Sequence, residues 1–183
     1  QNALTPEMLS ALGRILDEVE AEAGVRAVLL TSAGERFFCA GADINAWSGL
    51  SPQEFARIWV RGGHRLFDRL ARLGKPTIAV LHGNAFGGGL ELAAACDIRV
   101  MAPSAELALP ETGVGIVPGW SGTQRLMRLL PEPVVKEMAL FGRRLSADRA
   151  LALGFVAEVS SNPLETATAI AARLSGTSPT ATE

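Results

Sequence analysis

Apolar side chains recur at helical spacing in two long segments of the first half of the chain. The first helix is predicted to start at Thr5-Pro6, where a capping hydroxyl precedes a proline, and to stop near Gly24. Its apolar face consists of Met8, Leu12, Ile15, Leu16 and Val19. The second helix begins at the capping box Ser51-Pro52-Gln53-Glu54 and ends at Gly74. Its apolar face consists of Phe55, Ile58, Trp59, Leu66, Phe67, Leu70 and Leu73.

Short apolar and β-branched runs alternate with further helical patterns in the rest of the chain. Strands are predicted at 25–31, 77–81, 97–101, 105–109 and 155–159. Helices are predicted at 90–96, 122–130, 133–141, 146–153 and 164–174. Loops are predicted where small residues, glycine or proline accumulate, at 32–45 and 113–119. Strands that alternate with helices are typical of an α/β domain with largely parallel strand pairing.

Three consecutive glycines stand between an extended apolar segment, 76–86, and an apolar helix. In Gly87-Gly88-Gly89-Leu90-Glu91, the N–H groups at the helix start are uncrowded and can receive a negatively charged oxygen. Glu91 follows one turn later among apolar residues, where a carboxylate must be paired, hydrogen-bonded or protonated. This combination indicates carbonyl chemistry, although a glycine run also occurs as a plain strand–helix junction.

Two further segments are candidates for the same site, and each also has an ordinary structural interpretation. The loop of residues 37–44 has small residues at its bend. Such residues let a backbone approach a ligand closely, but they also fit a plain tight turn. Glu111 follows a predicted strand and precedes a glycine-rich loop, where a glutamate is usually solvated. Neither segment indicates a function when it is taken alone.

The composition narrows the class of protein and its partners. A chain of 183 residues that is 48% hydrophobic is expected to form one globular domain with a sizeable core. The formal net charge of −2 and the lack of a basic run argue against nucleic acid and membrane surfaces as partners. Cys39 and Cys96 lie in apolar contexts, which predicts buried thiols in a reducing compartment such as the cytoplasm. His64 and His82 are expected to be structural, and no metal-ligand cluster is visible.

Taken together and in this order, the candidate segments resemble the enoyl-CoA hydratase/isomerase (crotonase) superfamily. The stretches that carry the resemblance are Asn2-Ala3-Leu4, Phe38-Cys39-Ala40-Gly41-Ala42-Asp43-Ile44, Lys75-Pro76-Thr77-Ile78-Ala79-Val80, 83–91, Ala95-Cys96-Asp97-Ile98, Leu109-Pro110-Glu111, 118–126 and 142–156. The resemblance implies an α/β fold built as a spiral of ββα units, with one core domain over residues 1–183. It also implies opening strands before this segment and C-terminal helices after it, which we expect to be absent from this chain.

The resemblance implies roles for particular backbone and side-chain groups. The N–H groups of Ala42 and Gly88 would form an oxyanion hole for a thioester carbonyl. Glu91 and Glu111 would act as an acid–base pair on a water molecule and the substrate double bond, and the N–H of Gly119 would help to hold that water. The CoA adenine would pack in the loop 40–44. The implied substrate-binding residues are Ala40, Gly41, Asp43, Ile44, Gly87 and Gly119.

The presence of both acids favours an enoyl-CoA hydratase, which adds water reversibly to a 2-trans-enoyl-CoA, as in fatty acid metabolism. The alternatives are another CoA-thioester reaction of the same family, such as double-bond isomerisation or dehydration of a polar acyl-CoA, and a non-catalytic acyl-CoA-binding protein. Coenzyme A would enter as part of the substrate, with no separate cofactor and no metal. The resemblance further implies a homotrimer or a hexamer.

The three tryptophans have two interpretations each. Trp120 stands where small residues are common in the family, so it either narrows the acyl pocket or covers the outside of its loop. Trp47 and Trp59 either line that pocket or pack in the core, and Trp59 lies on the apolar stripe of its predicted helix.

Overall fold

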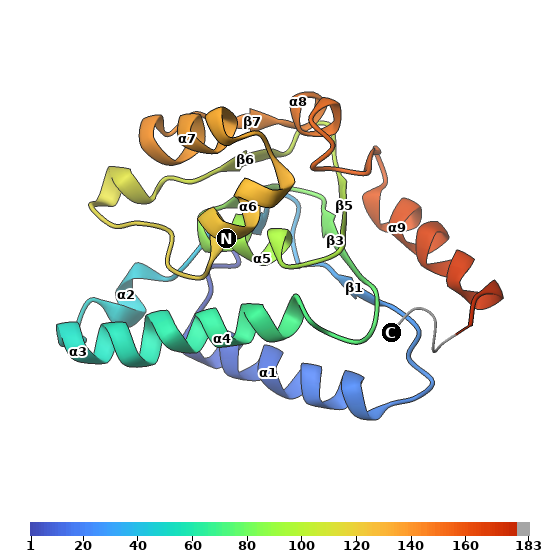
Figure 1. The fold of residues 1–183 in the computed structure, drawn as a ribbon, viewed down its shortest axis with the longest axis horizontal. Coiled ribbons are helices and arrows are strands. Elements are labelled where there is room, and N and C mark those ends of the chain that lie inside the picture. The colour runs from blue at the N-terminus through green and yellow to red at the C-terminus, as the bar shows by residue number, and fades with distance from the viewer. Residues whose placement is uncertain (179–183) are drawn as a thin grey trace.

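The computed structural model describes residues 1–178. They form two four-stranded sheets with helices around them (Figure 1). The first sheet has the order β1-β3-β5-β8, and its neighbouring strands are parallel. Its strands are β1 (Val28–Leu30), β3 (Thr77–Leu81), β5 (Ile98–Met101) and β8 (Glu158–Val159). Each of these strands falls inside a predicted one, so this sheet confirms the prediction from the apolar runs.

The second sheet has the order β2-β4-β6-β7, and only its last pair, β6 and β7, is antiparallel. Its strands are β2 (Phe37–Cys39), β4 (Asn84–Phe86), β6 (Glu106–Ala108) and β7 (Leu145–Ser146). Successive strands alternate between the two sheets: along the chain, β1 is followed by β2, β3 by β4 and β5 by β6. The predicted α/β class with largely parallel pairing is confirmed.

The helices surround the sheets, except for one that lies inside (Figure 1). Helix α5 (Gly88–Ala94) is buried along its whole length, and α6 (Gly122–Leu129) packs on it. Helices α1 (Pro6–Ala21) and α4 (Arg61–Leu70) lie together along one side of the molecule. The helices of the C-terminal part are α7 (Glu132–Phe141), α8 (Ala147–Ala152), α9 (Pro163–Ala172), which packs on β3 and β5, and the short η3 (Arg173–Gly176).

The extended segment 76–86 is divided between the two sheets, at a turn that the hydrophobic pattern did not reveal. Strand β3 ends at Leu81 and β4 begins at Asn84. Gly83 lies between them, and a β-carbon at this position would come within 2.6 Å of the carbonyl carbon of Arg36. The chain can therefore pass from one sheet to the other only because residue 83 has no side chain.

Residues 32–45 were expected to be one loop, and this prediction is wrong. The segment contains β2 and the start of α2 (Ile44–Trp47), which is capped by the Asp43 side chain. Strand β7 was likewise missed, because Ser146 was taken as the start of a helix. Strand β2 was missed because Phe37–Cys39 runs directly into small residues that favour a loop, and β7 was missed because Ser146 also caps α8. Both strands pair with a neighbour, β2 with β4 and β7 with β6.

The second predicted helix is three consecutive pieces: α3 (Pro52–Glu54), a π-helical segment η1 (Phe55–Val60), and α4. A π-helix inserts one extra residue per turn and so shifts the apolar face. Trp59 is buried, as expected from the apolar stripe, whereas Ile58, expected on the same stripe, is 57% exposed. The capping box at Ser51 and Glu54 is present as predicted.

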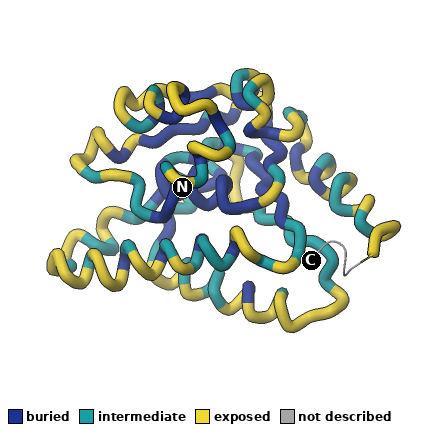
Figure 2. The backbone as a smooth tube through the Cα atoms, in the orientation of Figure 1, coloured by how far each residue is buried: buried dark blue, intermediate teal, exposed yellow. Residues whose placement is uncertain are grey.

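The buried part of the chain follows the strands of both sheets and α5, while the outer faces of α1, α4, α7 and α9 are exposed (Figure 2). Cys39 and Cys96 are buried free thiols, as predicted. Arg99 is buried as well, and it donates hydrogen bonds to the carbonyls of Ala93 and Cys96 at 3.3 and 2.7 Å. Because these carbonyls lie at the end of α5, this cation holds the C-terminal end of that helix.

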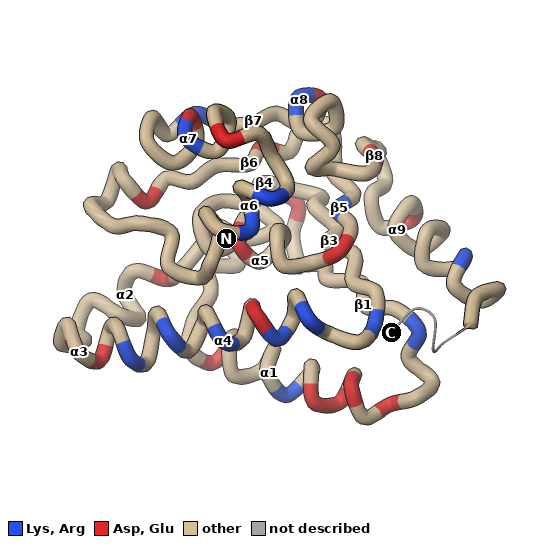
Figure 3. The backbone as a smooth tube through the Cα atoms, in the orientation of Figure 1, with Lys and Arg blue, Asp and Glu red and all other residues tan. Residues whose placement is uncertain are grey.

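Charged residues lie mainly on the outer helices (Figure 3). Arg69 of α4 forms ion pairs with Asp17 and Glu20 of α1, which joins these two helices at the surface. Over residues 1–178, no helix is both long and apolar enough to cross a membrane.

Candidate active site

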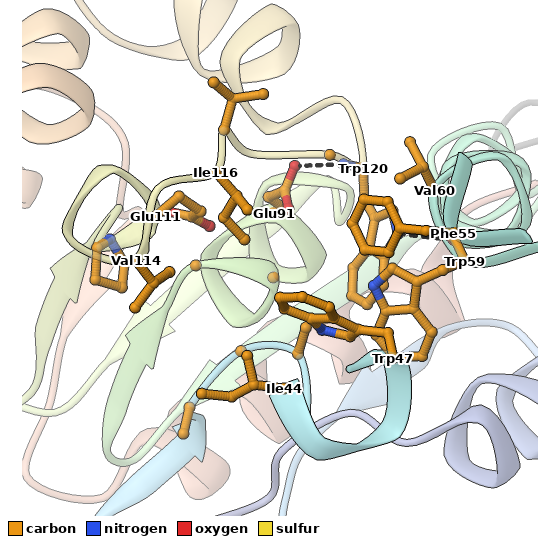
Figure 4. Close-up of a pocket in the computed structure, with 18 residues that line it drawn as sticks. Ile44, Trp47, Phe55, Trp59, Val60, Glu91, Glu111, Val114, Ile116 and Trp120 are labelled. Carbon is orange, nitrogen blue, oxygen red and sulfur yellow. Dashed lines mark hydrogen bonds between the residues drawn. The ribbon is translucent and has the colours of Figure 1, made fainter. Parts of the chain in front are cut away.

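A cavity of about 410 Å³ opens beside the N-terminus of α5 (Figure 4). Its walls come from the loop after β2, from α2 and η1, and from the loop 110–120 that follows β6. All of the predicted site residues except Asp43 line this cavity. The carboxylate of Asp43 instead accepts a hydrogen bond from the N–H of Asn45, which caps α2.

Two backbone N–H groups meet at one edge of the cavity. Gly87 has a positive φ (φ 51°, ψ −122°) and is the N-cap residue of α5, so that Gly88 is the first residue of that helix. A β-carbon on Gly88 would lie 3.5 Å from the nitrogen of Ala42, which belongs to the loop after β2. Within residues 1–178, neither the Ala42 nor the Gly88 N–H donates a hydrogen bond. Such unpaired donors at a helix start attract a negatively charged oxygen.

Glu91 lies on α5, one turn after these glycines, and is only 2% exposed. Its Oε1 atom accepts hydrogen bonds from the N–H of Trp120 at 2.8 Å and from the N–H of Gly122 at 2.7 Å. Burial raises the pKa of the Glu91 carboxyl group above its ordinary value, while these two N–H donors and the nearby Arg125 act in the opposite direction. Glu91 is therefore a desolvated acid whose ionised form has fixed partners.

Glu111 starts the short helix η2 (Glu111–Val114) and is 7% exposed. Its Oε2 atom has no hydrogen-bond partner in the described part of the chain. The side chain packs on Gly87, where a β-carbon would lie 2.7 Å from Oε1 of Glu111. Burial, with a smaller contribution from the charge of Glu91, raises the pKa of Glu111 from 4.5 to about 7. The two carboxyl groups thus have different environments: Glu91 is held by donors and Glu111 is not.

Aromatic side chains form the wall opposite the two glutamates (Figure 4). Trp120 points inward and is 3% exposed, so the interpretation that it covers the outside of its loop is wrong. Its ring packs against Trp59 and Phe67, with centroid distances of 5.2 and 5.1 Å, and its Nε1–H donates to the carbonyl of Trp59. Trp59 is both a core residue and a wall of the cavity, and Trp47 also lines it.

Sequence reasoning missed several apolar wall residues. The missed residues are Phe55, Val60, Pro110, Val114, Ile116 and Val117. Phe55 was assigned to the core-facing stripe of its helix; it packs against the core and also lines the cavity. Val114 and Val117 lie in a loop rich in glycine, and their side chains are 59% and 74% exposed. β-branched residues in such a loop could have indicated a binding wall.

No group of three or more His, Cys, Asp and Glu side chains in residues 1–178 could hold a metal ion. The polar groups of the cavity are instead two carboxyl groups and backbone N–H donors. This set can move protons and stabilise charge on an oxygen atom.

Comparison with known proteins agrees with this geometry. The sequence model of the enoyl-CoA hydratase/isomerase family matches residues 1–183, and the chain belongs to this family. It is 42% identical over 181 residues to a probable enoyl-CoA hydratase of Bacillus subtilis (strain 168), covering 97% of this chain and 70% of that protein. It is 39% identical over 182 residues to the short-chain-enoyl-CoA hydratase of Clostridium acetobutylicum, covering 98% of this chain and 69% of the relative.

Solved structures give the same result. The crystal structure of enoyl-CoA hydratase from Bacillus anthracis superposes with a TM-score of 0.91 at 40% identity, covering 97% of this chain and 69% of that one. The family and the fold expected from the sequence motifs are therefore confirmed. The roles of the individual residues stay predictions.

Proposed function

We propose that this protein is an enoyl-CoA hydratase that adds water reversibly to a 2-trans-enoyl-CoA. The observation that carries the proposal is the placement of two buried carboxyl groups, Glu91 and Glu111, on a cavity that also receives two unpaired backbone N–H groups. Relatives named enoyl-CoA hydratase, at 42% and 39% identity, support the same reaction.

In the proposed mechanism the thioester carbonyl accepts hydrogen bonds from the N–H groups of Ala42 and Gly88. Adding water across the conjugated double bond moves negative charge onto that carbonyl oxygen. Fixed donors stabilise such charge, and the loss of one typically costs about 3 kcal/mol of transition-state stabilisation. The unpaired state of both N–H groups supports this role, because they need no rearrangement to receive the oxygen.

The different environments of the two glutamates suggest a division of labour. Glu91, whose carboxylate has two N–H donors, takes a proton from the attacking water. Glu111, whose raised pKa of about 7 keeps much of it protonated near neutral pH, supplies a proton to the carbon next to the carbonyl. Each such proton transfer typically contributes about 10² to 10⁴-fold in rate. In the reverse direction, dehydration, the two roles exchange.

The remaining parts of the proposal concern binding and assembly. The CoA adenine packs against the loop that contains Ala40, Gly41 and Ile44, the backbone of Gly119 helps to hold the water, and CoA enters as part of the substrate, without a separate cofactor. We also propose a homotrimeric or hexameric assembly in the cytoplasm. Sedimentation of the purified protein tests the assembly, and a stable monomer with full activity would contradict it.

The decisive experiment is an activity panel. Crotonyl-CoA is mixed with the purified protein, and loss of the conjugated-thioester absorbance is followed together with formation of the 3-hydroxyacyl-CoA. A 3-enoyl-CoA and a polar 3-hydroxyacyl-CoA are tested in parallel. Hydration of crotonyl-CoA supports the proposal. Conversion of the 3-enoyl-CoA alone would identify an isomerase, conversion of the polar substrate alone a dehydratase, and binding without turnover a non-catalytic protein.

A further inference from the structure

Ser121 has a backbone conformation that serine rarely adopts. Its φ of 71° and ψ of 18° lie in the left-handed region, and among residues 1–178 only one other non-glycine residue, Asn2, has a positive φ. Ser121 precedes α6 as its N-cap residue, yet its side chain does not cap that helix. The hydroxyl group is therefore used for something other than the usual role of serine at a helix start.

The Ser121 hydroxyl group contacts a histidine on α4 instead. The distance from its Oγ to Nδ1 of His64 is 2.5 Å, and Nε2 of His64 lies 3.2 Å from Oδ2 of Asp68. An ionised Asp68 carboxylate can accept a hydrogen bond but cannot donate one. Nε2 of His64 therefore carries the proton that faces Asp68. In the neutral imidazole, Nδ1 then accepts the hydroxyl hydrogen of Ser121. Asp68 also forms an ion pair with Arg125, which fixes this acceptor.

The same short turn supplies both N–H donors to Glu91. The N–H of Trp120 and the N–H of Gly122, on either side of Ser121, converge on Oε1 of Glu91 at 2.8 and 2.7 Å. A left-handed residue between two peptide units turns their N–H groups toward one anion. On the other side of the turn, Arg125 donates to the carbonyl of Trp120 at 2.8 Å. The conformation of Ser121 therefore decides whether Glu91 keeps both donors.

We propose that His64 and Ser121 are positioning residues, whose hydrogen bond holds the 120–122 turn so that both of its N–H groups stay on the Glu91 carboxylate. Neither residue lines the cavity, and both act through Glu91. The effect of these residues on kcat rests on the proposed hydratase function, whereas their effect on the hydrogen bonds and the pKa of Glu91 does not. A left-handed serine without this hydrogen bond relaxes toward negative φ, since its β-carbon disfavours the observed conformation.

Glycine at position 121 gives the sharpest test, because it adopts positive φ without help from a hydrogen bond. Ser121→Ala and Ser121→Gly both remove the hydroxyl group, but only alanine leaves the left-handed conformation unsupported. We expect Ser121→Ala and His64→Ala each to lower kcat about tenfold with little change in KM, as a slightly misplaced catalytic group would. Ser121→Gly should keep nearly full kcat, and His64→Ala added to Ser121→Gly should cost almost nothing further.

A second readout does not depend on activity. The ¹³C resonance of the Glu91 carboxyl group is titrated by NMR in each variant. Losing one N–H donor should raise the Glu91 pKa in Ser121→Ala and His64→Ala, and Ser121→Gly should show no such rise. The other charged groups that face Glu91 are Arg125 and Glu111, and both are unchanged in all variants. His82→Ala is the matched control, because His82 contacts Ser32 at 3.4 Å, away from the cavity.

The outcomes separate this proposal from the proposed function. If Ser121→Gly is as damaging as Ser121→Ala, the hydroxyl group acts directly and the positioning role is refuted. Equal effects of His64→Ala in both backgrounds would likewise refute it, because they would indicate an electrostatic effect of the imidazole. If the protein hydrates no enoyl-CoA but the Glu91 titration shifts and recovers as expected, the positioning role stands and the proposed function fails.

Discussion

The indole ring of Trp120 packs directly against Gly88: a β-carbon on Gly88 would lie 2.8 Å from Cζ3 of that ring, closer than real β-carbons come to a neighbour. Gly88 itself does not have a positive φ; the positive φ in this turn belongs to Gly87. Glycine is therefore required at position 88 by packing and not by backbone conformation. The Trp120 ring can occupy its place only because residue 88, at the start of α5, has no side chain.

The first prediction concerns this contact. Gly88→Ala should lower turnover per folded molecule by about 10²-fold, because the added methyl group displaces the indole ring or the first turn of α5 by enough to misalign the carbonyl. Turnover with crotonyl-CoA and the melting temperature are measured on the same preparation. Gly49→Ala is the matched control, since a β-carbon there would meet nothing within 4 Å. Normal turnover in folded Gly88→Ala would show that the contact between residue 88 and the Trp120 ring does not position the carbonyl.

The second prediction concerns acyl-chain length. Trp120→Leu should destabilise the protein by about 2 kcal/mol, because it removes ring contacts with Trp59 and Phe67, and it should also enlarge the cavity. The ratio of kcat/KM for a medium-chain over a short-chain enoyl-CoA should rise about tenfold. Steady-state kinetics with a series of chain lengths measures this ratio. A lowered stability with an unchanged ratio would show that Trp120 acts only as a core residue.

The third prediction concerns the two acids. Glu91→Gln keeps an amide oxygen that can accept the N–H groups of Trp120 and Gly122, so the fold should survive while proton transfer is lost. Glu91→Gln and Glu111→Gln should each reduce kcat by about 10² to 10⁴-fold with CoA-ester binding retained. The double variant should be little worse than the slower single variant, because the residues act as a unit. Glu132→Gln on the surface is the control. Full turnover in either single variant would exclude that residue from the mechanism.

The fourth prediction is a pH dependence of stability. The pKa of Glu111 is raised from 4.5 to about 7 in the folded protein, so the folded state binds this proton more tightly than the unfolded state. The stabilising contribution is complete below about pH 4.5 and is lost as the pH rises through about 7. The free energy of unfolding of the wild type, relative to Glu111→Gln, should therefore fall between about pH 5 and about pH 8. Urea unfolding of both proteins measures it, and parallel pH curves would contradict the prediction.

Much of the fold could be predicted from local patterns. The capping box at Ser51, the helix starts at Thr5-Pro6 and the apolar runs of β1, β3, β5 and β6 are short-range signals, and the structure has an element at each of them. Strands β2 and β7 could not be predicted, because the small residues after Cys39 favour a loop, Ser146 is also a helix cap, and both strands form by pairing with distant segments, β4 and β6. The apolar face predicted after Ser51 is correct for Trp59, Phe67 and Leu70 but wrong for Ile58, which lies in a π-helical segment that changes the spacing of that face.

For the site, the sequence by itself determined which chemical groups are available: the glycine turn, the buried acid Glu91 one turn later, and a second acid, Glu111, after another strand. These depend on neighbours in the chain, and their order is enough to indicate the family. Only the tertiary structure decided how these groups are arranged and buried. The inward position of Trp120, the two N–H donors on Glu91 and the lack of a partner for Glu111 all arise from contacts between distant segments. Desolvation and hydrogen bonding depend on these contacts, so the different environments of the two acids appear only in the folded protein.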